Sequence, residues 1–288
     1  MQSTVFYDGA VCPRESARIP LCDRSVFFAD AIYDAALAAN GHIAFCQAHT
    51  DRFFRNAEAL GIPCPLAPDA LTDALFRMLA YAEGEPCFLY FQLSRHAPAR
   101  THVYPDGAPG HLLITVDPIS LPRTADTLAL IGVPDERYGY CHIKTVGLLP
   151  NVLAAKAAER AGADEAVFLR RGRVTECAHS NVSLLKDGVL QTHPANRRIL
   201  PGIGRARLLA MAKRLGIPVR ERSFTPADLL AADEVLVTST SKLCMRVSSY
   251  NGLPVGKNTE EGKRLCRLLE EEFYAEVALP CPAPERGK

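Results

Sequence analysis

The chain has 288 residues, which is enough for two modest domains or one large one. Hydrophobic residues make up 48% and charged residues 23%, as is typical of a globular protein rather than of a disordered chain. Lys and Arg number 33 against 32 Asp and Glu, so the formal net charge of +1 gives no reason to expect nucleic acid or an anionic membrane as a partner.

Targeting and membrane segments are not evident. The first residues lack the basic and then apolar order of a signal peptide. No apolar run approaches the ~20 residues that cross a bilayer. We therefore expect a cytoplasmic protein. The ten cysteines are scattered, without a CxxC pair or zinc-finger spacing, and so predict buried free thiols and no metal site.

The first 120 residues predict an α/β domain with an antiparallel sheet. The pairs Asp8-Gly9 and Asn40-Gly41 are typical of tight turns in β-hairpins. An apolar, strand-like run from Phe28 to Leu37 precedes the second turn. After this turn, apolar residues at helical spacing predict helices, and further short apolar runs predict strands. The elements expected after the second turn are a return strand at 42–45, helices at 48–60 and 68–82 and strands at 87–93 and 111–116.

A domain boundary is expected near residue 120, because two prolines and little periodicity separate the two halves. The second domain, 121–279, alternates strands and hairpins with helices and is expected to form a barrel-like sheet with flanking helices. Residues 280–288 are expected to form a flexible tail. The strands expected in this domain are 128–133, 165–169, 173–175, 182–185, 189–192, 233–239 and 244–247, and the helices are 151–161, 205–215 and 259–278.

Two of the eight lysines, Lys144 and Lys242, lie near strand ends with apolar neighbours. The others lie on helices or their approaches, in a turn or at the terminus. Desolvation lowers the pKa of an amine and makes it a candidate for a Schiff base. The pattern alone favours a side chain that snorkels from a strand edge over a catalytic one.

The segment that begins at Lys144, Lys-Thr-Val-Gly-Leu-Leu-Pro-Asn, resembles the cofactor-lysine segment of fold-type IV (class IV) aminotransferases, in particular of D-amino-acid aminotransferases. The resemblance runs from about Tyr7 to Phe273 and includes further motifs in the family's order. These motifs are Thr175-Glu-Cys-Ala-His-Ser-Asn181, Thr192-His-Pro-Ala-Asn196, Ile199-Leu-Pro-Gly-Ile203 and Thr238-Ser-Thr-Ser241.

The resemblance implies an α/β two-domain enzyme with pyridoxal 5′-phosphate as its cofactor. Lys144 would form the Schiff base and later move the proton between the substrate Cα and the cofactor. Glu176 would face the ring nitrogen and keep the ring protonated. The resemblance assigns the remaining cofactor-binding residues chiefly to the phosphate group. They are Arg52 in its His-x-x-Arg setting, Ile203, Gly204, Ser239 and Thr240.

The same resemblance implies a substrate. Arg100 and His102, with Tyr33, match residues that hold the α-carboxylate, and Tyr90 lies in the segment leading to them. In the family this loop reaches in from the neighbouring subunit, so a homodimer is implied. The expected reaction moves the amino group of a D-amino acid, D-alanine foremost, to a 2-oxo acid such as 2-oxoglutarate.

Departures from the family pattern leave alternatives open. Gly204 stands where threonine is usual, which removes one hydroxyl from the phosphate site. His179 stands where small residues are common, and Ala29 and Ala31 lie in a segment that is usually richer in glycine. A branched-chain L-aminotransferase, an aminodeoxychorismate lyase and an (R)-amine transaminase remain alternatives on the same fold. A cofactor-free Schiff-base lyase and a non-catalytic cofactor-binding protein are the more distant ones.

Overall fold

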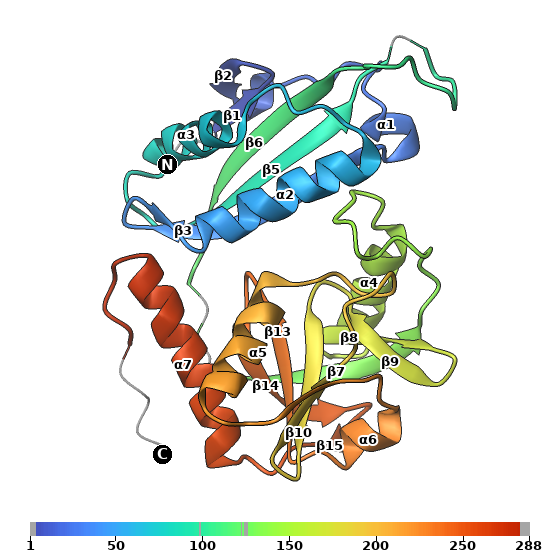
Figure 1. Cartoon of the computed structure of the whole chain (residues 1–288), viewed down its shortest axis with the longest axis vertical. Helices are drawn as coiled ribbons and strands as arrows, with labels where there is room; N and C mark the ends of the chain where they lie inside the picture. The colour runs from blue at the N-terminus through green and yellow to red at the C-terminus, as the bar shows by residue number, and fades with distance from the viewer. Residues whose placement is uncertain (1–3, 98, 122, 124–125, 283–288) are drawn as a thin grey trace. The chain divides into compact units, whose positions relative to one another are not determined.

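The computed structural model describes residues 4–97, 99–121, 123 and 126–282, which form two compact units (Figure 1). Unit 1 comprises residues 1–121, 143–147 and 275–279, and unit 2 comprises the rest. The end of the tail expected to be flexible, residues 283–288, lies outside the described residues, and the two-domain boundaries expected from the sequence stay a prediction.

Unit 1 is a six-stranded sheet with two helices on one face. The strand order is β2-β1-β6-β5-β3-β4, with neighbouring strands antiparallel. The strands are β1 (Thr4–Tyr7), β2 (Ala10–Pro13), β3 (Ala31–Ala39), β4 (His42–Ile43), β5 (Cys87–Arg95) and β6 (Gly110–Pro118). The helices are α1 (Ser25–Phe28), α2 (Cys46–Leu60) and α3 (Pro68–Leu79), with short 3-10 turns at Arg14–Ser16 and Ala80–Ala82.

The core of unit 1 lies between α2, α3 and the sheet. Phe53 of α2 and Leu75 of α3 are fully covered and pack with Phe91 of β5. Alternation along β3 sends Ile32 and Ala36 into this core, since successive strand residues face opposite sides of a sheet. The apolar spacing that predicts the two helices therefore also identifies the face that each of them buries.

Unit 2 is a nine-stranded mixed sheet in the order β12-β11-β10-β13-β14-β7-β8-β9, with β15 on β14. The strands are β7 (Thr127–Pro134), β8 (Glu165–Arg170), β9 (Arg173–Cys177), β10 (Asn181–Lys186), β11 (Val189–Thr192), β12 (Val219–Glu221), β13 (Glu234–Ser239), β14 (Leu243–Tyr250) and β15 (Leu253–Pro254). The helices are α4 (Leu149–Arg160), α5 (Ile203–Arg214), α6 (Pro226–Leu230) and α7 (Glu260–Glu276).

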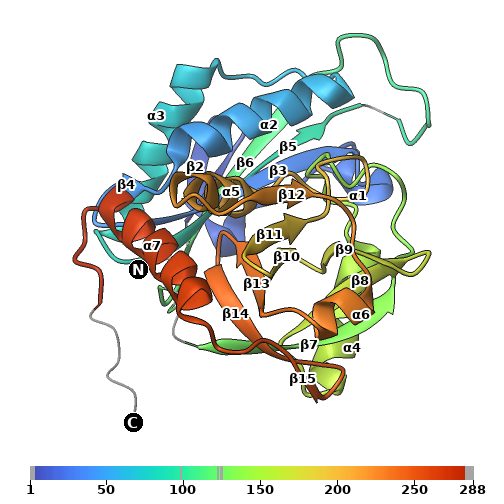
Figure 2. The same cartoon turned by 60° about the horizontal axis from the view of Figure 1, so that its bottom comes forward.

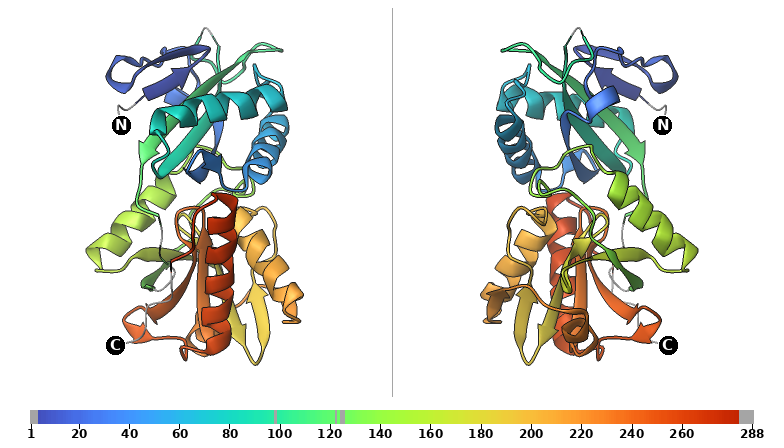
Figure 3. Two further views of the ribbon diagram at one scale, coloured as in Figure 1. Left: turned by 90° about the vertical axis from the view of Figure 1, so that its left-hand side faces the viewer. Right: turned by 90° about the vertical axis from the view of Figure 1, so that its right-hand side faces the viewer.

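The sheet of unit 2 curls (Figure 2) because β9, the last strand of its order, connects to β10 through only three residues, 178–180. The Cys177 amide donates to the Ser180 carbonyl in this link. Helices α5 and α7 lie side by side (Figure 3). They share one apolar core, in which Leu208 and Leu265 are fully covered. The expected α/β architecture with a barrel-like second sheet is confirmed.

Several local expectations were wrong. The strand expected from Phe28 begins at Ala31, because Ser25–Phe28 form a helical turn and Ala29 has a positive φ of 52° that ends it. Strands β12 and β15 and helix α6 were not expected. All ten cysteines are free, but only Cys87, Cys177, Cys244 and Cys266 are buried.

No helix in the described ranges is long and apolar enough to cross a membrane.

Candidate functional site

Lys144 lies on a short segment added to the edge of β3 in unit 1. Ile32 and Thr145 form an isolated antiparallel bridge, which places Lys144 opposite Tyr33. The Tyr33 amide donates to the Lys144 carbonyl at 2.9 Å. Directly opposed residues project from the same face, so Lys144 Nζ lies 4.2 Å from the centre of the Tyr33 ring. Lys144 is partly buried and belongs to unit 1, although we expected it in the second domain.

Tyr33 and Tyr90 form an aromatic wall beside this amine. Their rings stack with centroids 5.3 Å apart, because the two residues are diagonal neighbours on paired strands β3 and β5. The Tyr90 hydroxyl donates to Gln92 Oε1 at 2.6 Å, and burial raises the pKa of Tyr90. Two of the four residues expected to contact the substrate thus lie together near Lys144.

Arg52 lies in a buried polar group between α2 and β3. Its Nε and Nη2 donate to the two carboxylate oxygens of Asp34 at 2.7 and 2.8 Å. His49, three residues earlier on α2, places Nδ1 2.7 Å from Asp34 as well. Burial lowers the pKa of His49 against the opposing hydrogen bond and charge of Asp34, and the charges of Arg52 and Lys144 add to the lowering. Only 5% of Arg52 is exposed, so its side chain is buried rather than on the solvent side of α2.

Arg100 and His102 lie on the loop between β5 and β6, against α1. The Arg100 guanidinium lies 5.5 Å from the Phe27 ring centre and 5.4 Å from that of Phe28, and the His102 ring lies 5.3 Å from Phe28. Arg100 also lines a cavity of about 320 Å³ beside Phe27 and Phe28. In the described part of unit 1, no hydrogen bond, ion pair or ring contact joins Arg100 or His102 to Tyr33. Within one chain, the three residues expected to hold the substrate α-carboxylate are therefore not brought together.

Glu176 of β9 lies in unit 2 and is 5% exposed, so its carboxylate is buried rather than in water. Arg137 Nη1 donates to its Oε1 at 2.5 Å. Asn181 Nδ2 and the Leu200 amide donate to Oε2 at 2.9 and 3.0 Å. Burial raises the pKa of Glu176 to about 7, against the opposing effect of Arg137. Glu176 is therefore a buried carboxylate that can hold or release a proton near neutral pH.

Arg137 is held behind Glu176 by a second buried carboxylate, Asp135. Its Nε and Nη2 each donate to Asp135 at 3.0 Å, and Arg170 adds a third contact to Asp135 at 3.1 Å. Burial alone would raise the pKa of Asp135, but the hydrogen bonds and charge of Arg137 bring it below its usual value. Asp135 thus orients the guanidinium that contacts Glu176.

The start of α5 has the form of an anion site. Gly202 is its N-cap and has no side chain with which to cap the amides of the first turn. A Cβ at Gly202 would lie 2.1 Å from Asn181 Oδ1, so a side chain there would displace the Asn181 amide. A Cβ at Gly204 would lie 3.5 Å from the Ser239 amide nitrogen, which places the helix start beside the turn that carries Thr240. Unit 2 thus brings Ile203, Gly204, Ser239 and Thr240 together, as expected for a phosphate site.

Glu165, His179 and Lys242 form a further cluster in unit 2. Lys242 Nζ lies 2.5 Å from Glu165 Oε2, and His179 Nδ1 lies 2.7 Å from Oε1. Lys242 Nζ also lies 3.1 Å from His179 Nε2. The Glu165 side chain is 0% exposed, that of Lys242 15% and that of His179 53%. Lys242 is therefore paired with Glu165 and His179, and the expectation that its surroundings are apolar was wrong.

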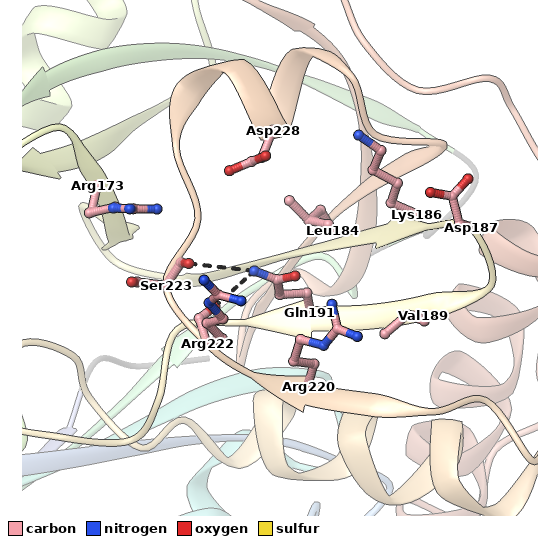
Figure 4. Close-up of a pocket in the computed structure, with 10 residues that line it drawn as sticks. All are labelled: Arg173, Leu184, Lys186, Asp187, Val189, Gln191, Arg220, Arg222, Ser223 and Asp228. Atoms are coloured by element: carbon pink, nitrogen blue, oxygen red, sulfur yellow. Dashed lines mark hydrogen bonds between the residues drawn. The ribbon is translucent and has the colours of Figure 1, made fainter.

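A separate cavity of about 540 Å³ opens on the sheet of unit 2 (Figure 4). Its lining includes Arg173, Lys186, Arg220 and Arg222. None of the residues expected to bind cofactor or substrate lines it, so its chemistry is not that of the candidate site.

Some residues that organise the site were not identified from the sequence. Asp34 and Arg137 hold the expected Arg52 and Glu176, and Glu165 holds His179 and Lys242. A signal existed for Asp34, which is the one charged residue in an apolar strand. No such signal marks Arg137, whose partner lies 39 residues away.

Comparison with known proteins identifies the family to which the chain is similar. A family model described as "Amino-transferase class IV" matches residues 31–250. A D-alanine aminotransferase of Listeria monocytogenes serotype 4b (strain F2365) is 34% identical over 291 residues, covering 99% of each chain.

Solved structures share the fold. The branched-chain aminotransferase of Thermoproteus uzoniensis, solved with norvaline, has a TM-score of 0.88 at 22% identity and covers 96% of each chain. The branched-chain amino acid aminotransferase from Escherichia coli has a TM-score of 0.85 at 21% identity, covering 100% of this chain and 98% of that one. At these identities the likeness establishes the fold alone.

Proposed function

The chain belongs to the class IV aminotransferases, and on this premise we propose that it moves the amino group of a D-amino acid, D-alanine foremost, to a 2-oxo acid such as 2-oxoglutarate. Enzymes of this family use pyridoxal 5′-phosphate. The observation that carries the proposal is the position of Lys144 opposite Tyr33 on the edge of β3, where the charges of Lys144 and Arg52 both act on His49. The full-length likeness to a D-alanine aminotransferase supports the D configuration.

The residues present fit this cofactor. Arg52 supplies a guanidinium fixed by Asp34, and guanidinium groups bind phosphate with two parallel hydrogen bonds. The start of α5, with Gly202 and Gly204, supplies amide groups at the positive end of a helix dipole. Thr240 and Ser239 add hydroxyl and amide donors from the neighbouring turn. We propose that these groups hold the phosphate and that Glu176 faces the ring nitrogen.

Lys144 is proposed as the group that binds the cofactor and then moves the proton at the substrate Cα. When bound, pyridoxal phosphate supplies an aldehyde for exchange with amines and a ring that accepts the electron pair left at Cα. The Lys144 amine takes the Cα proton and returns it. Tyr33, which stacks on Tyr90, gives this amine an aromatic neighbour at 4.2 Å that limits the directions it can take.

Glu176 is proposed to hold its charge against the protonated ring nitrogen. Its buried position strengthens any such charge interaction, because little water screens it. Asn181 and the Leu200 amide fix one oxygen, and Arg137 fixes the other. This arrangement orients the carboxylate before any ligand arrives, so little reorganisation is needed on binding.

The substrate α-carboxylate is proposed to bind Tyr33 together with Arg100 and His102 of a second copy of the chain. In the described residues of one chain these groups share no contact, which is consistent with a loop that serves its neighbour. Leu149, Val152 and Leu153 of α4 are exposed at 69%, 61% and 61% and lie on one helix face. Such a face supports a homodimer. We also propose that the enzyme works in the cytoplasm.

The test is stereochemical. Purified protein loaded with pyridoxal phosphate is incubated with D- or L-alanine and 2-oxoglutarate, and pyruvate is measured. We expect pyruvate from D-alanine and only background from L-alanine. Pyruvate from the L-isomer only would contradict the proposal and favour a branched-chain type of specificity.

A further inference from the structure

Lys242 and His179 connect two turns of unit 2. His179 belongs to the three-residue link that follows β9, and Lys242 belongs to the turn that follows β13. Their side chains meet at 3.1 Å across these turns. The first turn begins two residues after Glu176 and the second contains Thr240, so each member of the pair is close in sequence to a residue proposed to bind the cofactor.

The shared carboxylate, Glu165, has donors besides Lys242. His179 donates to it through both its backbone amide, at 2.9 Å, and its ring nitrogen, at 2.7 Å. The Ser180 hydroxyl donates at 2.9 Å. These three donors, from the two consecutive residues His179 and Ser180, already supply most of the hydrogen bonds that a buried carboxylate requires. A lysine is therefore not needed merely to pair the oxygens of Glu165.

The ammonium of Lys242 has capacity left. It carries three N–H groups, of which one points to Glu165 and one to His179 Nε2. Within the described ranges, no other hydrogen bond or ion pair involves Lys242 Nζ. His179 is half exposed, so a ligand can reach the pair from the surface of unit 2. The cluster thus presents a fixed cation beside a half-exposed imidazole.

We propose that Lys242, with His179 beside it, binds the second carboxylate of a dicarboxylic substrate, such as C5 of 2-oxoglutarate or the side chain of D-glutamate. This inference rests on the proposed function and adds the residues that distinguish dicarboxylic from monocarboxylic substrates. An ammonium group held in place by a buried anchor loses little conformational entropy on pairing, which favours a net gain in affinity. Pyruvate and alanine have no second carboxylate and leave this pair without a ligand.

The alternative is that the pair only ties the two turns together. The two readings differ in what a matched pair of ligands does. Glutarate and valerate have the same carbon chain, and valerate carries a methyl group where glutarate carries its second carboxylate. Their binding to the protein loaded with pyridoxal phosphate is measured by isothermal titration calorimetry, which does not depend on turnover.

We expect the wild-type protein to bind glutarate about 10-fold more tightly than valerate, as one charge-assisted hydrogen bond provides. Lys242→Met should bring this ratio close to one without weakening valerate, and His179→Ser should reduce it. Lys242→Arg, which keeps the charge, should preserve part of it. Lys186→Met, which removes a lysine from a hairpin of unit 2 outside the cluster, is the matched control and should leave the ratio unchanged.

A wild-type ratio near one, or a ratio that survives Lys242→Met, overturns the inference. If Lys242→Met does not fold, His179→Ser decides the point, because its side chain is half exposed. Amino transfer from D-alanine to 2-oxobutyrate, which has one carboxylate, separates this inference from the proposed function. If the amino group is transferred but glutarate and valerate bind about equally, the second-carboxylate site is refuted and the proposed function is not. A ratio near 10 without transfer from any D-amino acid refutes the transaminase and leaves the subsite standing.

Discussion

Asp34 holds Arg52 through two parallel hydrogen bonds, from Nε and Nη2 to its two carboxylate oxygens at 2.7 and 2.8 Å. Asp34 is 0% exposed and also contacts His49 at 2.7 Å. Burial would raise the pKa of Asp34, but the charge and hydrogen bonds of Arg52 keep it well below its usual value. The guanidinium is therefore fixed by an ionised carboxylate within unit 1.

Asp34→Asn should weaken the binding of pyridoxal phosphate by about 10-fold, because Arg52 loses its charged anchor and part of its fixed orientation. The dissociation constant is measured by absorbance titration of the apoprotein. Asp51→Asn, on the exposed side of the same helix next to Arg52, is the control and should leave the constant unchanged. An unchanged constant in Asp34→Asn would separate Asp34 from cofactor binding.

Glu176→Gln should lower kcat for D-alanine by about 100-fold, in the range found when a positioned proton-holding group is removed. Glutamine keeps the shape and can still accept from Asn181 and the Leu200 amide, but it has no charge to hold a proton on the ring nitrogen. Steady-state kinetics and the absorbance of the bound cofactor report the effect. Glu271→Gln on α7 is the control. A kcat within twofold of wild type would place Glu176 outside the reaction.

Glu165→Gln should make the protein less stable at neutral pH and change its response to acid. Burial raises the pKa of Glu165, but His179 and Lys242 lower it, to about 2 from an ordinary 4.5. A carboxyl whose folded pKa is depressed stabilises the fold above pH 4.5 and loses this contribution as the pH falls towards 2. The contribution is about 3 kcal/mol.

Urea unfolding at pH 7, 5 and 3 measures the effect of Glu165→Gln. The difference in unfolding free energy between wild type and variant should be largest at pH 7 and shrink below pH 4.5. Glu58→Gln, on the exposed side of α2, serves as the control for losing one glutamate. A difference that stays constant from pH 7 to pH 3 would contradict the ionised state of Glu165.

Gly204→Thr should tighten the binding of pyridoxal phosphate by several-fold, about the value of one added hydrogen bond. A Cβ at this position would lie 3.3 Å from Thr238 Cβ, which requires a shift of a few tenths of an ångström. Gly204→Val has the same branched shape without the hydroxyl and isolates this steric cost. We expect the Gly204→Thr variant to bind pyridoxal phosphate more tightly than the Gly204→Val variant. Equal affinities would show that no phosphate oxygen lies within reach.

The sequence predicts the elements that carry the site better than the contacts that fix it. The apolar spacing of α2 predicts a helix on which His49 and Arg52 are three residues apart, and the structure confirms this helix. The sequence predicts a helix from Arg205, and α5 begins two residues earlier, at Ile203. These features are local, and local chemistry determines them.

Contacts between distant residues have no local signal. Glu165 and Lys242 are separated by 77 residues, and Arg137 and Glu176 by 39, so only the register of the sheet brings them together. Lys144 illustrates the same limit. Its segment joins the edge of β3, more than 100 residues earlier, and pattern alone favoured a snorkelling side chain. One missed element had a usable signal, since Thr225 and Asp228 form the capping box that starts α6.

The most direct test of the account is to find which amine binds the cofactor. The protein loaded with pyridoxal phosphate is reduced with borohydride, digested and analysed by mass spectrometry, with Lys144→Ala as the comparison. We expect one phosphopyridoxyl adduct, on Lys144, and none in the variant. An adduct on Lys242 or any other lysine, or no adduct in the wild-type protein, would contradict it.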